Sequence, residues 1–195
     1  MKTWQDIHSY WFKDLSLEKN YLKERGQLWF GKNPKVDRYM RKQFLPLLKD
    51  FSAGRHFTEW KSNPQSYVSL IVLLDQFSRN IFRGSSQMYA YDHAALNLTL
   101  EGLKKSVDED LHPLERVFFY LPLEHSENLN IQRLSVKMFK QLMEEDKIFT
   151  EHYIYAVKHY DIVAKFGHFP HRNEILNRPS SPQETEFLKQ PGSSF

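Results

Sequence analysis

The chain has 195 residues, with 27 Lys and Arg against 24 Asp and Glu, a formal net charge of +3 and no cysteine. The lack of cysteine excludes disulfides, thiolate metal sites and a cysteine nucleophile, and it fits a cytoplasmic protein. Because basic and acidic residues are interspersed, the charge does not predict a nucleic-acid surface. No apolar run approaches the ~20 residues of a transmembrane helix, so no membrane partner is expected.

The length predicts a single domain over residues 1–195, with a tail that frays from about residue 190. Apolar side chains recur at helical spacing almost throughout. Thr3 and Asp6 resemble an N-cap and open a short aromatic helix. Apolar positions three or four residues apart predict a buried helical face over residues 36–51. Residues 67–82 predict a central helix, because their N-terminal half is apolar on nearly all sides.

The second half of the chain is also predicted to be helical. Pro113 suits the first turn of a helix, Pro122 is expected to kink or end that helix, and Gly167 is expected to end a later one. Ser181 and Glu184 form a capping-box pattern before a short last helix. The remaining segments are helices over about 87–105, 131–143 and 150–166, with a loop at 108–112. No segment alternates with period two, so we expect an all-α fold of about seven to nine helices in antiparallel pairs.

The first polar motif lies within the predicted central helix and contains Asp75, Gln76, Arg79, Asn80 and Arg83. Residues four apart share a helix face, so this face offers a carboxylate, two amides and two guanidinium groups. One interpretation is a ligand-binding strip in which the arginines hold an anion by bidentate bonds. The alternative is a buried structural network in which Asp75 pairs with Arg79 and the amides bond to neighbouring backbone.

The second motif, His125-Ser126-Glu127, follows Pro122 and is expected to open a new helix. A carboxylate near a helix N-terminus is stabilised by the helix dipole, which applies here to Glu127. We interpret His125 and Glu127 as acid–base candidates. A metal site would have to combine these residues with His159 and His171, and no pair has ligand spacing of its own, so no metal is predicted.

The third motif follows the glycine and proline that end the helix at about residue 166. His171, Arg172 and Asn173 stand in this turn, and turns held by a rigid scaffold often carry function. In one interpretation His171 is a further acid–base candidate, and Arg172 and Asn173 bind a ligand. In the alternative, Arg172 and Asn173 bond to exposed carbonyl groups at the neighbouring helix ends. His159, in the middle of the preceding helix, is either a ligand-binding residue or a satisfied histidine of the core or surface.

Residues 73–83, 121–127 and 165–173 together resemble the bacterial domain-of-unknown-function family 924. The similarity extends to Trp29, Phe30, Asp37, Phe44, Trp60 and Asp92 and to the segment 176–188. The resemblance implies a helical superhelix similar to tetratricopeptide-repeat folds, and it implies no activity. The family usually has Arg in place of His168 and Gly in place of Asn177. The second difference places the Asn177 side chain where the backbone is expected to adopt a positive φ.

The leading functional hypothesis is a site for a small anionic or polar molecule, with acid–base catalysis left open and no cofactor expected. The other hypothesis is a helical scaffold whose concave face binds a peptide or protein, with purely structural polar motifs. Because isolated buried charges are costly, we expect at least two of the three motifs to bring side chains into contact, within a mostly buried pocket with aromatic walls.

Overall fold

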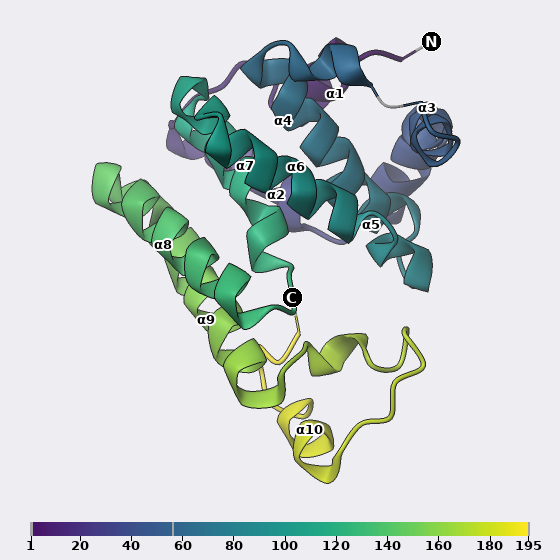
Figure 1. Ribbon diagram of the computed structural model, residues 1–195, viewed down its shortest axis with the longest axis vertical. Coiled ribbons are helices and arrows are strands. Elements are labelled where there is room, and N and C mark those ends of the chain that lie inside the picture. Colours follow the sequence, from purple (N-terminus) through teal and green to yellow (C-terminus); the bar gives the residue numbers. More distant parts are fainter. Residues whose placement is uncertain (1, 56, 195) are drawn as a thin grey trace. The chain divides into compact units, whose positions relative to one another are not determined.

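The computed structural model describes residues 2–55 and 57–194. Within these ranges the chain forms helices and turns and no strand, so the all-α prediction is confirmed (Figure 1). None of the described helices is both long enough and apolar enough to cross a bilayer. The superhelical arrangement of the tetratricopeptide type stays a prediction.

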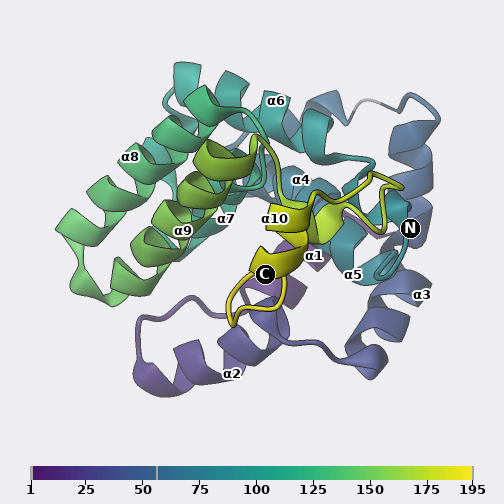
Figure 2. The ribbon, with the colours of Figure 1, turned by 90° about the horizontal axis from the view of Figure 1, so that it is seen from below.

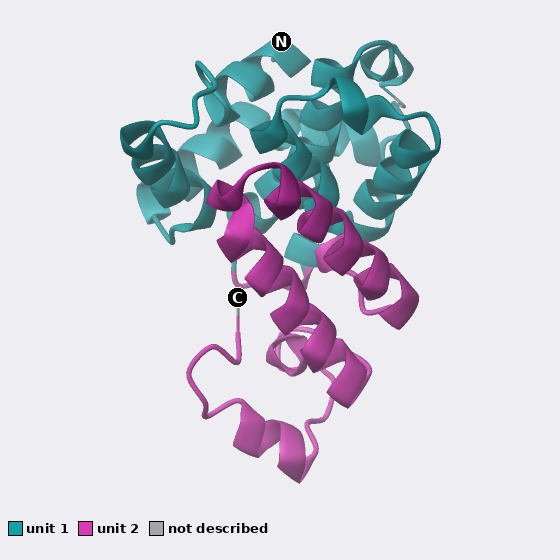
Figure 3. Cartoon of the chain, turned by 90° about the vertical axis from the view of Figure 1, so that its left-hand side faces the viewer, with its two compact units in different colours: residues 1–83, 87–122 teal, residues 84–86, 123–195 magenta. Residues whose placement is uncertain are grey.

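Packing divides the chain into two compact units (Figure 3). Unit 1 comprises residues 1–83 and 87–122, and unit 2 comprises residues 84–86 and 123–195. The boundary between residues 122 and 123 falls inside a helix. The expectation of one domain over residues 1–195 stays a prediction, and each unit is described by itself.

Unit 1 is built from helices joined by short 3₁₀ turns. The helices are α1 (Trp4–Trp11), α2 (Lys19–Phe30), α3 (Pro34–Ser52), α4 (Pro64–Val72), α5 (Ser78–Ile81), α6 (Asp92–Lys104) and α7 (Pro113–Glu124), whose last two residues belong to unit 2. The core is aromatic: the Phe77 ring lies 5.3 Å from the Trp11 ring and 4.8 Å from the Phe44 ring between centroids. Edge-on and tilted ring pairs of this kind add to the stability gained by burial.

No element is predicted from the sequence where α2 lies. Two of its side chains bond to the carbonyl groups at the end of α1, where helix carbonyls lack intrahelical partners. Trp29 Nε1 donates to Trp11 O at 2.9 Å, and Arg25 donates to the carbonyl groups of Tyr10 and Trp11. The apolar periodicity of α2 is too weak to predict a helix. These polar contacts help to hold α2 in place.

The predicted central helix is present but is not a uniform α-helix. A π-helical turn, Leu73–Phe77, joins α4 to α5, and its five residues are all buried. Turns of this type are rare and are frequently found at functional sites. The first polar motif begins inside this turn, a feature that apolar spacing alone does not predict.

Unit 2 contains α8 (Leu129–Glu145), α9 (Thr150–Phe166) and α10 (Pro182–Phe187). A short turn, Lys147–Phe149, joins α8 to α9, and the two helices run side by side in opposite directions (Figures 1 and 2). The prediction for residues 150–166 is confirmed, as is the left-handed Gly167 with φ of 77°. The capping box of Ser181 and Glu184 is also present.

The helix α7 ends at Glu124, directly before His125 as expected, with Pro122 inside its last turn, and the kink at Pro122 stays a prediction. Two other predicted boundaries are wrong. The predicted loop at 108–112 contains a 3₁₀ turn, Val107–Asp110, and the helix expected from residue 87 begins only at Asp92, after a 3₁₀ turn at Ser86–Tyr89. Short 3₁₀ turns lack the apolar repeat that identifies longer helices.

Two helical glycines of unit 1 should respond oppositely to alanine. A Cβ atom at Gly102 would lie 2.5 Å from Phe119 Cζ and 3.1 Å from Tyr67 Cε1, whereas one at Gly26 meets nothing within 4 Å. We therefore expect Gly102→Ala to lower the free energy of unfolding by about 1–2 kcal/mol through overpacking. Gly26→Ala should raise it by about 0.5–1 kcal/mol through helix propensity. Urea unfolding measures both, and stabilisation by Gly102→Ala would contradict the packing of α6 against α7.

Candidate functional site

The first motif forms a buried ion network within unit 1. Arg79 lies 3.3 Å from the carboxylate of the fully buried Asp75, as one alternative predicted. Its guanidinium group also forms a fork on Asp92 at the start of α6, with bonds of 2.9 and 3.0 Å. The arginine thus joins the π-helical turn to α6. Helix-face spacing could not predict Asp92 as a partner of Arg79, because Asp92 belongs to another helix.

A second carboxylate binds the other end of the motif. Asp37, in the first turn of α3, accepts from Asn80 Nδ2 at 2.9 Å and from the Arg83 fork at 2.7 and 3.1 Å. Gln76 donates to the carboxylate of Asp75 at 2.5 Å. The amides therefore bind carboxylates, and the predicted bonds from them to neighbouring backbone are wrong. An anion-binding role for Arg79 and Arg83 stays a prediction, and both already bind carboxylates of the chain.

The second motif does not open a helix. Asn128 is the N-cap of α8, and its side chain accepts from Asn130 N at 2.9 Å, so Glu127 precedes the helix and lies outside its first turn. Glu127 nevertheless lies near the N-terminus of α8, directly before its N-cap, as expected, and its stabilisation by the helix dipole stays a prediction.

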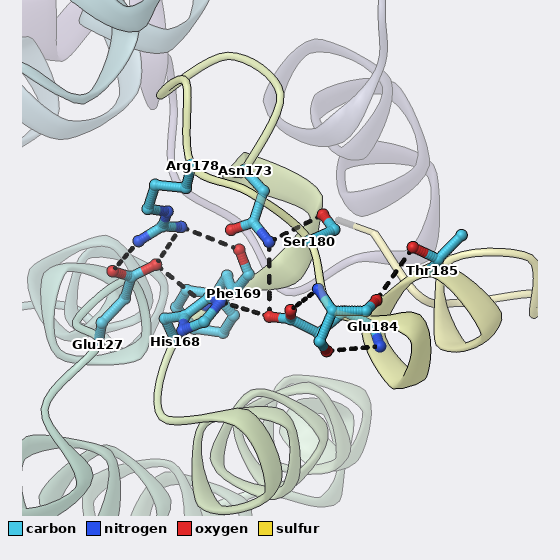
Figure 4. Close-up of polar contacts among 9 residues, drawn as sticks. Glu127, His168, Phe169, Asn173, Arg178, Ser180, Glu184 and Thr185 are labelled. Atoms are coloured by element: carbon cyan, nitrogen blue, oxygen red, sulfur yellow. Dashed lines mark hydrogen bonds and ion pairs between the residues drawn. The ribbon is translucent and has the colours of Figure 1, made fainter.

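Glu127 instead binds the turn that follows α9 (Figure 4). Its carboxylate accepts from Phe169 N at 3.0 Å and from the Arg178 fork at 2.8 and 3.0 Å. Burial by itself raises the pKa of Glu127, but the bonds from Arg178 and from the Phe169 N–H outweigh it, so its pKa lies below the usual value. Glu127 is therefore an anion at neutral pH.

Arg178 is a site residue that the sequence analysis missed. Asn177 before it has φ of 53°, which confirms the expected positive φ at this position. The left-handed turn lets Arg178 N donate to Asn173 O at 2.8 Å, while its guanidinium group also donates to Phe169 O at 3.1 Å. The sequence signal that could have identified Arg178 is its place directly after Asn177, a residue type that tolerates positive φ.

Arg172 forms a second link between the two motifs. Its guanidinium group donates to His125 O at 3.0 Å and lies 4.5 Å from the centroid of the Phe169 ring. The second and third motifs therefore meet through the Arg172 side chain and the His125 backbone, and the predicted contact between side chains of two motifs stays a prediction. Asn173 donates to Ser180 Oγ at 3.0 Å and, more weakly, to Glu184 at 3.4 Å (Figure 4), so the carbonyl contacts expected for Asn173 are wrong.

Two histidines of unit 2 lie beside the Phe169 ring. The rings of His159 and His171 lie 5.4 and 5.6 Å from it between centroids, and the rings of His125 and His159 lie 6.5 Å apart. Burial lowers the pKa of His159 to about 3 and that of His171 to about 4, so both are uncharged at pH 7. We call the following residues the Phe169 cluster: Glu124, His125, Glu127, His159, Phe169, His171 and Arg172.

Metal-binding groups and cavities among the described residues bear on which ligands the protein can hold. Among residues 2–55 and 57–194, no three His, Asp or Glu side chains are arranged to bind a metal ion. One cavity of unit 1, of about 530 Å³, lies between α1 and α3 and is lined by residues such as Asp6, Gln43 and Asp50. It includes none of the predicted site residues, and the predicted aromatic pocket around them stays a prediction.

The buried histidines predict a pH dependence of stability. In the unfolded chain a histidine takes up a proton below pH ~6.5, whereas folded His159 does so only near its pKa of about 3. Its contribution to stability is therefore complete above pH ~6.5 and is lost as the pH falls towards 3, with a slope of up to about 1.4 kcal/mol per pH unit. His159→Gln should reduce the slope of unfolding free energy between pH 6 and 4.5, measured by urea unfolding. The exposed His93→Gln is the control, and equal slopes in both variants would refute the burial of His159.

Comparison with known proteins places the chain in a family. The family model "Bacterial protein of unknown function (DUF924)" matches residues 7–192. A solved structure of a protein of unknown function from Agrobacterium tumefaciens is 32% identical, with a TM-score of 0.79, and the match covers 95% of this chain and 96% of that chain. No curated protein shows significant similarity. The chain therefore belongs to the DUF924 family of bacterial proteins, as its three motifs indicated.

Proposed function

We propose that the Phe169 cluster of unit 2 binds a small polar molecule that carries an anionic group. The observation that supports this most directly is the link between two distant turns. Arg172 and Glu127 each bond across more than 40 residues of sequence, and both bonds bring ionisable side chains to one place. Such bonds require the two turns to hold a defined geometry.

The energetic cost of the cluster supports a ligand-binding role. Glu124, His159 and Arg172 are each less than a tenth exposed. Replacing buried ionic groups by apolar side chains is often neutral or stabilising, so stability alone does not require them here. Clustered groups with strongly shifted pKa values, as in His159 and His171, are typical of functional sites.

The proposed roles follow from charge and exposure. Arg172 attracts the anionic group, while Asn173 orients the ligand. His125, Glu127 and His171 are partly exposed and are the acid–base candidates if the ligand reacts. His171 is an uncharged base beside the cation of Arg172, which lowers its pKa further after burial. The first motif, in unit 1, is not needed for this proposal, and no described contact favours the peptide-scaffold alternative.

Inorganic phosphate is a suitable first probe of this site. We expect phosphate to raise the melting temperature more than sodium chloride does at equal ionic strength, because it binds the folded state. Arg172→Gln keeps a donor for His125 O and loses the charge, so the extra stabilisation should disappear. Arg133→Gln, at an exposed position of α8, is the matched control and should respond as the parent does. An unchanged response in Arg172→Gln would contradict the anion-binding role.

Native mass spectrometry tests the proposal without assuming a ligand. The protein purified under gentle conditions should carry a small molecule, and His171→Gln should carry less of it because a contact in the cluster is lost. His152→Gln makes the same substitution elsewhere in unit 2, beside the rings of Phe139 and Phe149, and should retain the molecule. Equal occupancy in both variants would place the ligand outside the Phe169 cluster.

A further inference from the structure

The positive charge of the chain is concentrated on α3, the helix of unit 1 labelled in Figure 1. Between Pro34 and Ser52 the sequence has five basic residues against two acidic ones, an excess of three. That excess equals the net charge of the whole chain, so basic and acidic residues balance in the remainder. The interspersed charges of the sequence therefore conceal a local excess on one helix.

Four of these cations form a row on the outer face of α3. We call it the α3 row, and it consists of Lys35, Arg38, Lys42 and Lys49. At 3.6 residues per turn, the four positions fall within about 60° of the helix circumference and extend over about 21 Å. All four residues are exposed, and none of them forms an ion pair within the described part of the chain. The row therefore presents uncompensated positive charge to solvent.

The acidic residues of α3 do not neutralise the row. Asp37 accepts from the Arg83 fork, and the carboxylate of Asp50 lies 3.1 Å from Arg55. Each acid is thus paired with a cation from outside α3, and the side chains of Asp37 and Asp50 are only 16% and 27% exposed. Because both acids are already matched, a potential of one sign extends along the row.

An exposed aromatic ring lies beside the row. Tyr39, directly after Arg38, is 45% exposed, although the Tyr10 ring stacks on it at 5.2 Å between centroids and an interplanar angle of 27°. Sequence-independent binding of single strands combines cations that follow the phosphate backbone with aromatic rings on which bases stack. The α3 row and Tyr39 supply both kinds of contact.

Other anionic partners fit this face less well. The centre of a protein–protein interface is depleted in charged residues and rich in apolar ones, whereas this face carries four cations. A helix that binds a membrane surface places its apolar face in the lipid. The apolar face of α3 is buried in the protein, through Met40, Phe44, Leu47 and Leu48. The outer face thus offers mainly charge, which is what a phosphate backbone requires.

We propose that the α3 row binds the phosphate backbone of a single-stranded nucleic acid, with a base stacked on Tyr39. The row belongs to unit 1, and the inference does not depend on the function proposed for the Phe169 cluster of unit 2. Cations that neutralise phosphates release counterions from the nucleic acid. Binding is therefore independent of sequence and strongly dependent on salt.

A fluorescein-labelled oligothymidylate of about 20 nucleotides is the probe, because it forms no duplex. If four cations contact phosphates, a plot of the logarithm of the association constant against that of the salt concentration should have a slope of about −2.8. The affinity, measured by fluorescence anisotropy, should then fall about fiftyfold between about 50 and 200 mM sodium chloride. No binding at the lower salt concentration would overturn the proposal.

The double variant Arg38→Gln/Lys42→Gln removes half of the row, so the slope should change to about −1.4. Arg133→Gln/Lys137→Gln is the matched control, because it replaces the same residue types at the same spacing at exposed positions of α8. The control should keep the parental slope. Equal effects in the two double variants would show that net charge alone attracts the oligonucleotide, which would exclude a specific role of the row.

Tyr39→Leu tests the stacking contact. Leucine keeps an apolar side chain and a high helix propensity but has no aromatic face, so the affinity should fall at least about fivefold at an unchanged salt slope. Tyr155→Leu, at an aromatic residue of unit 2 that is 46% exposed, is the control and should bind as the parent does. An unchanged affinity in Tyr39→Leu would contradict the assignment to a single strand.

Vesicles that contain phosphatidylserine distinguish a nucleic acid from a lipid surface. At the salt concentration where the oligonucleotide binds, the protein should not sediment with these vesicles, because the outer face of α3 has no apolar side to insert. Sedimentation with vesicles that is lost in Arg38→Gln/Lys42→Gln would assign the row to a membrane surface and overturn the proposal.

Discussion

Unit 2 depends on the carboxylate of Glu127. It accepts hydrogen bonds from Phe169 N and from the guanidinium group of Arg178, and so joins the turn after α7 to the turn after α9. Each turn lies beyond a helix end, and the bond from Arg172 to His125 O joins the same two turns. The partly buried carboxylate remains charged because three N–H groups donate to it, and its bond to Phe169 N holds the residue whose ring lies beside His159 and His171.

Elements whose sequence signal is local could be predicted. Residues 150–166 have apolar spacing, a glycine at the end and no interruption, and the helix there has the predicted bounds. The α2 helix has no comparable local signal. Arg25 and Trp29 hold it through bonds to α1, and such bonds cannot be read from the spacing of apolar residues. The π-helical turn was also beyond reach, because a widened turn keeps the apolar character of the helix while changing its hydrogen bonds.

Site residues were predictable to the extent that each motif is contiguous in sequence. The partners of those residues come from far along the chain, such as Asp37 for Arg83 and Arg178 for Glu127. Helix-face spacing relates residues three or four apart and carries no information on such pairs. Arginine forks bind carboxylates of the chain in both units, on Asp92 in unit 1 and on Glu127 in unit 2. Arg172 of unit 2 differs, because it donates to a backbone carbonyl and lies over the Phe169 ring.

The left-handed backbone at Asn177 has a consequence for how this turn varies. The sequence resemblance implies a glycine here in the family, and both glycine and asparagine reach φ of 53° at low steric cost, whereas a β-branched residue would be strained. An exchange between Asn and Gly would therefore leave the Arg178 fork on Glu127 unchanged. It would act mainly on the unfolded chain, where glycine has more conformational freedom to lose on folding. The asparagine thus holds the same turn with a smaller loss of chain entropy than glycine would incur.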